Sequence, residues 1–234
     1  MASAIQPIKL IKKEWKEDMP AQQPISFSDN DAVRGMDVSH RQGDIDWGQV
    51  AASGIQFCYV KATEGVGFKD IRFREYFDSS KTAGLLTGAY HFFRPDKDAE
   101  AQAESFIHVV SGLKPGDLPP VLDVEVSAGK DVKTILDGIQ QWLEAVENVL
   151  GHRPIVYTYP SFWNQTLSGS SRFADHMLWV ANYTANTSPK LPIGFSDYVI
   201  WQFSEHGKIT GISGDVDLDR FHGTLDDLKA LAWL

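Results

Sequence analysis

From residue 34 onward, short apolar runs alternate with longer segments in which apolar residues recur every three or four positions. Short runs bounded by turn residues predict strands, whereas the longer periodicity predicts amphipathic helices. The predicted strands are residues 34–39, 56–62, 86–92, 119–125, 154–159, 177–182, 198–204 and 215–221. Between the first five strands, the predicted helices are residues 47–53, 73–84, 99–112 and 132–151.

The last third of the chain follows a different pattern. Beyond residue 159 the connections are short or rich in Gly, Ser and Pro, and we expect no full helix before residues 224–231. Strands that alternate with helices favour a parallel sheet. We therefore predict an α/β fold, an irregular TIM-like β/α barrel of eight parallel strands with helices mainly between the first five. An open doubly wound sheet is the alternative, but Gly65-Val-Gly67 lacks the third glycine of a dinucleotide-binding turn.

The first 33 residues differ from the rest. Apolar residues between Ile5 and Trp15 fall on one helical face with lysines nearby, and a polar linker follows at residues 19–31. This pattern fits a membrane- or partner-binding arm, or a segment packed on the domain. We therefore divide the chain into an N-terminal arm or linker of unknown role, residues 1–33, and one barrel domain, residues 34–234.

Composition excludes several classes of protein. The formal net charge is −9 and no basic stripe is present, so we expect no nucleic-acid partner. Cys58 is the only cysteine and the histidines have no metal-binding spacing, so we predict no metal site and no cofactor. No apolar run is long enough to span a membrane, and no signal peptide is recognisable at the start. We expect a monomer made in the cytoplasm.

Polar and aromatic residues gather toward the C-terminal ends of the predicted strands. They are Asp37, Lys61, Tyr90, Asp123, Glu125, Tyr157, Trp179, Trp201 and Asp217. In barrel enzymes this end carries the active site, because the loops there open onto one mouth. Four carboxylates together with several aromatic rings are typical of a site that cleaves sugars, since acids protonate the glycosidic oxygen and rings stack on pyranoses.

The stretch PPVLDVE, residues 119–125, carries the strongest of these signals. Asp123 and Glu125 are two positions apart on a strand, so their side chains point to the same side. Burying two like charges together is costly unless they have a task. The other residues are weaker signals on their own: Asp37 also fits a loop or capping position, and Tyr157, Trp179 and Trp201 also fit a core.

Five motifs, in order, resemble glycoside hydrolase family 25, the Chalaropsis-type lysozymes. They are RGMDVSHRQGDIDW, FCYVKATEGVGFKD, AGLLTGAYHFF, LPPVLDVE and YVIWQFSEHGKITGISGDVDLDRF, and the similarity covers about residues 34–222. The resemblance implies an N-acetylmuramidase that cuts the β-1,4 bond between N-acetylmuramic acid and N-acetylglucosamine in peptidoglycan. It also implies an irregular barrel with fewer helices than strands.

The same resemblance implies a role for each acid. Glu125 matches the family's general acid/base, and Asp123 matches a partner that acts as nucleophile or stabilises an oxazolinium formed by the substrate. Asp37 and Asp217 match two further acids that line the mouth. The substrate-binding residues predicted from motifs and strand ends are Tyr90, Tyr157, Trp179, Trp201 and Lys61. Because an i, i+2 pair can reach the carboxylate separation of retaining enzymes, about 5–5.5 Å, we predict net retention.

Two other functions compete with this one. A chitinase-like barrel would need a further acid at the position of Val121, in the pattern D-x-D-x-E, so the sequence disfavours it. A glycan-binding module on the same barrel needs the aromatic rings but no proton donor, and the presence of all four acids argues against it. The expected partner is the peptidoglycan glycan strand, and the expected setting is a phage endolysin released through a holin pore or a delivered antibacterial toxin.

Overall fold

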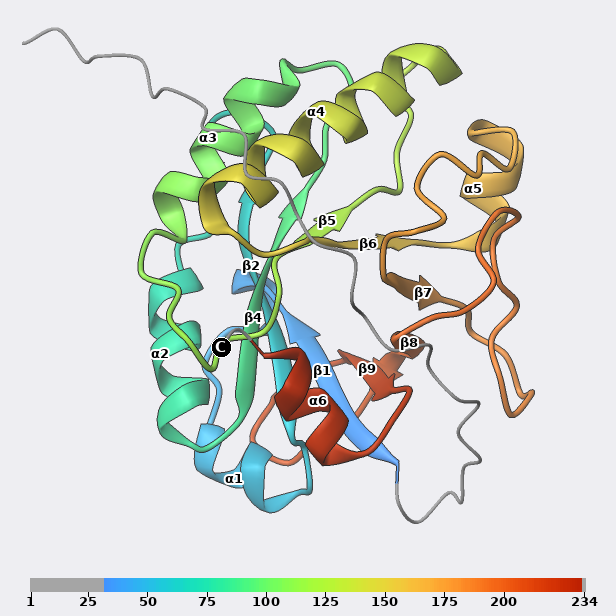
Figure 1. Ribbon diagram of the computed structural model, residues 1–234. Helices are drawn as coiled ribbons and strands as arrows, with labels where there is room; N and C mark the ends of the chain where they lie inside the picture. Colours follow the sequence, from blue (N-terminus) through green and yellow to red (C-terminus); the bar gives the residue numbers. More distant parts are fainter. Residues whose placement is uncertain (1–31, 233–234) are drawn as a thin grey trace, which may run out of the picture.

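The computed structural model describes residues 32–232, and within them eight strands close into a barrel, as predicted (Figure 1). The barrel strands are β1 (Val33–Val38), β2 (Phe57–Glu64), β4 (Leu86–Phe92), β5 (Val121–Asp123), β6 (Ile155–Thr158), β7 (Leu178–Ala181), β8 (Ile200–Gly207) and β9 (Val216–Phe221). Their order is β1-β9-β8-β7-β6-β5-β4-β2, and pairing of β1 with β2 closes the ring. The short β3 (Phe68–Lys69) forms a hairpin with the end of β2.

The barrel is not parallel throughout, and the sequence-based prediction was wrong for its last strand. β9 runs antiparallel to both β8 and β1, whereas the other neighbouring barrel strands are parallel. A parallel connection needs a crossover of a dozen or more residues. Only residues 208–215 separate β8 from β9, so the chain can return only in the opposite direction.

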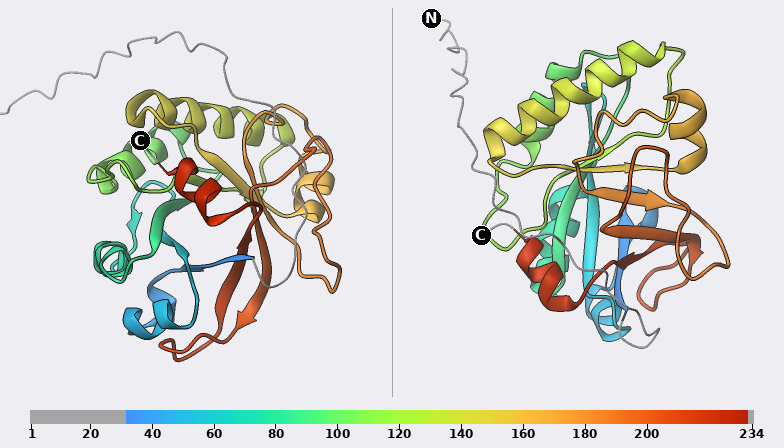
Figure 2. Two further views of the ribbon diagram at one scale, coloured as in Figure 1. Left: turned by 60° about the horizontal axis from the view of Figure 1, so that its bottom comes forward. Right: turned by 45° about the vertical axis from the view of Figure 1, so that its right-hand side comes forward.

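The four helices predicted between the first five barrel strands are present. They are α1 (Trp47–Ala52), α2 (Phe73–Thr82), α3 (Ala99–Val109) and α4 (Val132–Leu150). Figures 1 and 2 show α2, α3 and α4 against the strands of the first half of the barrel, while loops flank β7, β8 and β9. α6 (Leu225–Leu231) was also predicted. The seven-residue α5 (Pro160–Thr166) was not: Pro160 occupies its first turn, where the fixed φ of proline favours a helix.

α4 shows how sequence sets one of these helices. Asp131 caps its first turn by accepting a hydrogen bond from the Thr134 amide, and Gly151 ends it in the left-handed conformation at φ 70°. Its buried face packs toward the barrel through Ile135, Ile139, Trp142, Leu143 and Val146. The helix therefore ends one residue before the end of the predicted range 132–151.

The core has two layers, and their arrangement leaves one end of the barrel open. The outer layer lies between strands and helices, and the inner layer fills the barrel around Phe57, Tyr59 and Trp179. Leu228 of α6 belongs to the inner layer and packs at the end where β2 begins. α6 covers that end of the barrel. The opposite end, where the parallel strands finish, is therefore the one that can hold a cavity. No described helix is long and apolar enough to cross a membrane.

The arm predicted at residues 1–33 lies outside the described residues except for its last two positions. Val33 is buried and begins β1, where it pairs with Phe221 of β9. The barrel therefore includes this residue, one position before residue 34.

Candidate active site

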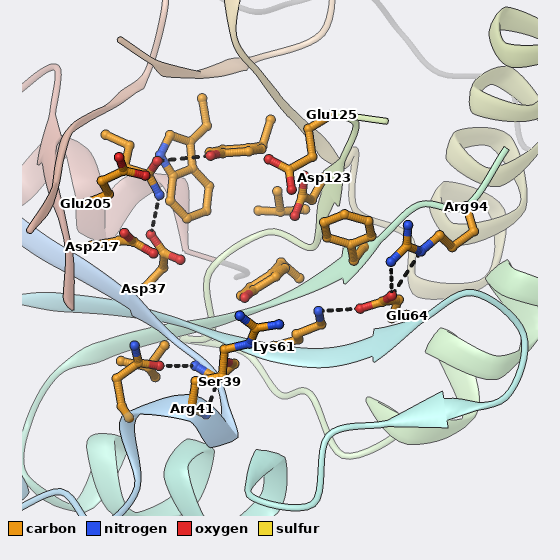
Figure 3. A pocket seen from close by; sticks show the side chains of 18 of the residues that line it. Asp37, Ser39, Arg41, Lys61, Glu64, Arg94, Asp123, Glu125, Glu205 and Asp217 are labelled. Atoms are coloured by element: carbon orange, nitrogen blue, oxygen red, sulfur yellow. Dashed lines mark hydrogen bonds and ion pairs between the residues drawn. The ribbon is translucent and has the colours of Figure 1, made fainter. Parts of the chain in front are cut away.

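A cavity of about 520 Å³ opens at the end of the barrel where the parallel strands finish (Figure 3). Eight of the nine residues predicted for the site line it: Asp37, Lys61, Tyr90, Asp123, Glu125, Tyr157, Trp179 and Asp217. These residues come from seven different barrel strands and from the segment that follows β5. The closed barrel therefore brings together side chains that lie up to 180 positions apart in the sequence.

Hydrogen bonds to β6 hold the backbone of the Asp123–Glu125 pair. β5 ends at Asp123, but the next residue stays bonded to β6: the Val124 amide donates to the Tyr157 carbonyl at 2.9 Å, and the Thr158 hydroxyl donates to the Val124 carbonyl at 2.8 Å. This fixes the backbone on which Glu125 sits. Both carboxyl groups then face the cavity (Figure 3).

Burial controls the electrostatics of this pair. Asp123 is 7% exposed, and its Oδ1 has no hydrogen-bond partner within residues 32–232. Burial and the neighbouring charge of Glu125 raise the pKa of Asp123 well above its usual range. Burial also raises the pKa of Glu125, against the opposing charges of Lys61 and Arg94. Asp123 is buried and Glu125 is partly buried. Because two such neighbouring carboxyls resist double ionisation, the pair binds protons as a unit.

Opposite this pair lies a second acidic group. Asp37 of β1 is directly paired with Asp217 of β9, and Asp219 lies two residues further along the same strand. Burial and the charge of Asp217 raise the pKa of Asp37, while burial and the charge of Glu205 raise the pKa of Asp217 to about 6. The fully buried Asp219 accepts a hydrogen bond from Trp179 Nε1 at 3.0 Å.

Gln202 links the second acidic group to two tyrosines. Its Nε2 donates to Asp37 Oδ2 at 2.7 Å. Its Oε1 accepts hydrogen bonds from the hydroxyls of Tyr157, at 2.9 Å, and Tyr183, at 2.8 Å. The network fixes the Asp37 carboxylate at the cavity wall and leaves Tyr183 as a half-exposed ring at the rim.

Trp201 is the one predicted residue that the structure does not bring into the cavity. It precedes Gln202 on β8, and neighbouring side chains on a strand point to opposite faces. Since Gln202 faces the cavity, Trp201 lies in the outer core, where its Nε1 donates to the Asn182 carbonyl at 2.8 Å. We therefore withdraw Trp201 from the substrate-binding set.

Sequence reasoning missed several cavity residues: Ser39, Arg41, Gln42, Glu64, Phe92, Arg94, Tyr183, Gln202 and Glu205. It also missed Asp219, which lies beneath the cavity. Two of these had a visible signal. Gln202 is a polar residue within an apolar strand. Asp219 lies two positions after Asp217, so on a strand its side chain points to the same side. Within the described residues, no cluster of His, Cys, Asp and Glu is arranged to hold a metal ion.

Basic residues form the remaining side of the cavity. Lys61 Nζ lies 2.6 Å from Glu64, and Arg94 pairs with the same carboxylate. The ring of Phe92 contacts both cations, with Lys61 Nζ at 4.8 Å and the Arg94 guanidinium carbon at 4.6 Å from its centre. A buried acid pair, a second acidic group and a basic side together suit acid–base chemistry on a polar, ring-shaped substrate.

Comparison with known proteins supports this interpretation of the site. The model of the family described as glycosyl hydrolases family 25 matches residues 36–212. Lysozyme M1 of Streptomyces globisporus is 36% identical over 223 residues, covering 91% of this chain and 76% of that protein. The bacterial lysozyme structure from Streptomyces coelicolor matches with a TM-score of 0.83 at 35% identity, covering 87% and 98% of the two chains. A family 25 lysozyme of Aspergillus fumigatus matches with a TM-score of 0.80 at 30% identity, covering 87% and 100%.

Proposed function

The chain belongs to glycosyl hydrolases family 25, and we propose that it is a lysozyme, an N-acetylmuramidase that hydrolyses peptidoglycan. The bond cut is the β-1,4 link between N-acetylmuramic acid and N-acetylglucosamine. The observation that carries this proposal is the Asp123–Glu125 pair, whose two carboxyl groups face the cavity and whose raised pKa values favour the protonated form. A glycan-binding module has no use for such a pair.

We assign the proton transfer to Glu125. Its carboxyl group donates a proton to the glycosidic oxygen as the bond from that oxygen to C1 breaks, and the bonding electrons leave with N-acetylglucosamine. Asp123 stabilises the positive charge at C1, either by bonding to C1 or by steadying an oxazolinium formed by the acetamido oxygen. Glu125 then takes a proton from water, whose oxygen bonds to C1 while the bond from C1 to Asp123, or to the acetamido oxygen, breaks and the product is released.

The remaining residues bind and orient the sugar. Asp37 and Asp217 are proposed to accept hydrogen bonds from the substrate, and the bond from Gln202 supports this role for Asp37. Tyr90, Tyr157, Trp179 and Lys61 are proposed to contact the glycan, which their place in the cavity lining supports. Tyr183, and not Trp201, is proposed to supply the aromatic ring at the rim, which its half-exposed place in the cavity lining supports.

Net retention at C1 belongs to the same proposal, because both routes through Asp123 invert the centre twice. An NMR time course of hydrolysis tests it: the β-anomer is expected first, and the α-anomer first would refute it. For the biological setting we keep the two alternatives of a phage endolysin and a delivered antibacterial toxin. Both place the enzyme's action at the bacterial cell wall.

Mass spectrometry of digested peptidoglycan tests the activity and the role of Glu125 together. After digestion, borohydride reduction marks each new reducing end. We expect reduced muramic acid from the wild type, none from Glu125→Gln, and wild-type levels from Glu104→Gln, an exposed glutamate on α3. Reduced glucosamine would instead indicate a glucosaminidase. No new ends from the wild type would return the binding module as the better proposal.

A further inference from the structure

The basic side of the cavity contains more positive charge than its own carboxylate balances. Arg41, Lys61 and Arg94 line it, and Glu64 is the acid among them (Figure 3). Burial alone would raise the pKa of Glu64, but hydrogen bonds from Lys61 and Arg94 outweigh it and hold this pKa below its usual range. Glu64 is therefore ionised and paired with both Lys61 and Arg94. Arg41 is the third cation on this side, and Glu64 does not pair with it.

Arg41 is held in place by its backbone. It is the central residue of η1 (His40–Gln42), a single turn of 3-10 helix capped by the side chain of Ser39. The buried carboxylate of Asp70 accepts hydrogen bonds from the His40 amide at 3.0 Å and from His40 Nδ1 at 2.7 Å. The turn is thus fixed to the wall of the cavity next to the end of β1.

The guanidinium of Arg41 has no such anchor. The residue is exposed and lines the cavity, and no hydrogen bond or ion pair within residues 32–232 engages its side chain. Figure 3 shows its head group directed toward Lys61, away from Asp37 and Asp217. A fork of N–H donors on a fixed turn, facing a cavity, matches the geometry of a carboxylate.

We propose that Arg41, assisted by Lys61, binds a carboxylate carried by the muramyl unit of the substrate. The inference rests on the proposed muramidase function. N-acetylmuramic acid differs from N-acetylglucosamine by its lactyl ether, whose carboxyl group is either free or extended by a peptide stem with carboxylates of its own. The acidic side of the cavity repels such a group and the basic side attracts it. Arg41 thereby orients the muramyl unit and distinguishes it from a plain N-acetylglucosamine unit.

The test compares charged and neutral forms of one glycan. Strands stripped of peptides by an amidase carry free lactyl carboxylates, and coupling them to methylamine removes this charge. On stripped strands we expect Arg41→Gln to lower kcat/KM about 5- to 20-fold, the range for losing one charge-assisted pair near a surface. On methylamide strands we expect a change of less than about twofold, since the charge it pairs with is absent. Arg41→Lys should recover part of the loss, and Arg34→Gln, an exposed arginine at the other end of β1, should change neither value.

The outcomes distinguish a lactyl carboxylate from a stem carboxylate. They also distinguish failure of the Arg41 proposal from failure of the muramidase proposal. A loss confined to stripped strands supports binding of the lactyl carboxylate. A loss confined to peptide-bearing strands, and abolished by methylamide coupling of their stems, supports binding of a stem carboxylate. An equal loss on charged and neutral strands, or no loss on either, overturns the role of Arg41 while leaving the muramidase intact. Failure of the wild type to cleave any strand overturns the muramidase function itself.

Discussion

The oxygen Oδ1 of Asp123 faces the cavity without a hydrogen-bond donor from the described residues. A buried, unpaired carboxylate is destabilising, and the adjacent Glu125 adds a like charge. Lys61 and Arg94 oppose this by lowering the pKa of both acids. The protonation of the pair is therefore a balance between burial and two nearby cations, and removing one cation should shift it.

Lys61→Met should extend activity toward higher pH. In the proposed mechanism Glu125 acts as an acid, so activity is lost as pH rises through the apparent pKa of the pair. Removing the positive charge of Lys61, which lowers the pKa of both acids, favours the protonated form and so raises the apparent pKa of the pair. The pH dependence of kcat/KM on soluble glycan strands measures the shift, because it reports the free enzyme. Lys69→Met, an exposed lysine on β3, is the control, and an unchanged or lower alkaline limb would contradict the prediction.

At the level of single residues, sequence predicted most of the cavity lining but not the direction of every side chain. Asp123 and Glu125 could be placed at the cavity from the sequence, because a strand that buries an i, i+2 pair of acids carries a large cost unless the acids have a task. Trp201 was misplaced because a nearly continuous apolar strand does not show which of its two faces points inward. Arg41 carried no signal at all, since its importance comes from partners that it lacks in the folded chain.

At the level of elements, the interior of the barrel depends on pairing large residues with glycines. Phe57 of β2 lies opposite Gly35 of β1, and Tyr59 lies opposite Gly88 of β4. A Cβ added at Gly88 would lie 2.3 Å from the Tyr59 ring, which also packs on Trp179 with ring centres 4.9 Å apart. These aromatic rings fill the barrel beneath the cavity, so the cavity floor depends on the two glycines.

Gly88→Ala should destabilise the barrel. The added methyl group forces the buried Tyr59 ring to move, and overpacking of this kind costs about 1–3 kcal/mol in the free energy of unfolding. Urea unfolding followed by tryptophan fluorescence measures the change. Gly214→Ala is the matched control, because a Cβ there meets nothing within 4 Å. A Gly88→Ala protein as stable as the control would mean that Tyr59 has room to move.

The elements themselves were mostly visible in the sequence. Each predicted barrel strand and each predicted helix is present, because apolar runs and helical periodicity record what the core requires. The direction of β9 was not visible, since periodicity is the same for parallel and antiparallel strands. α5 was missed because Pro160 also marks a turn, and only the surrounding structure decides between a turn and a helix start.

On the scale of the whole molecule, the enzyme and its substrate both carry net negative charge and repel each other. The chain has a formal net charge of −9, whereas peptidoglycan carries many free carboxylates on its peptide stems. The basic residues of the cavity are therefore a local exception on a molecule that the cell wall repels at long range. Salt weakens the long-range repulsion more than the short-range attraction within the cavity, because the screening length falls from about 30 Å at 0.01 M to about 10 Å at 0.1 M.

Added salt should consequently speed the digestion of intact cell-wall sacculi at low ionic strength. Between 0.01 M and 0.1 M NaCl we expect the initial rate to rise about two- to fivefold, since long-range repulsion is screened before contacts within the cavity are. Short methylamide-coupled strands, which carry little charge, should change by less than about twofold over the same range and serve as the control. Release of soluble reducing ends measures both rates. A rate on sacculi that falls from the lowest salt onward would show that attraction by the basic side of the cavity, and not the net charge, governs the approach to the wall.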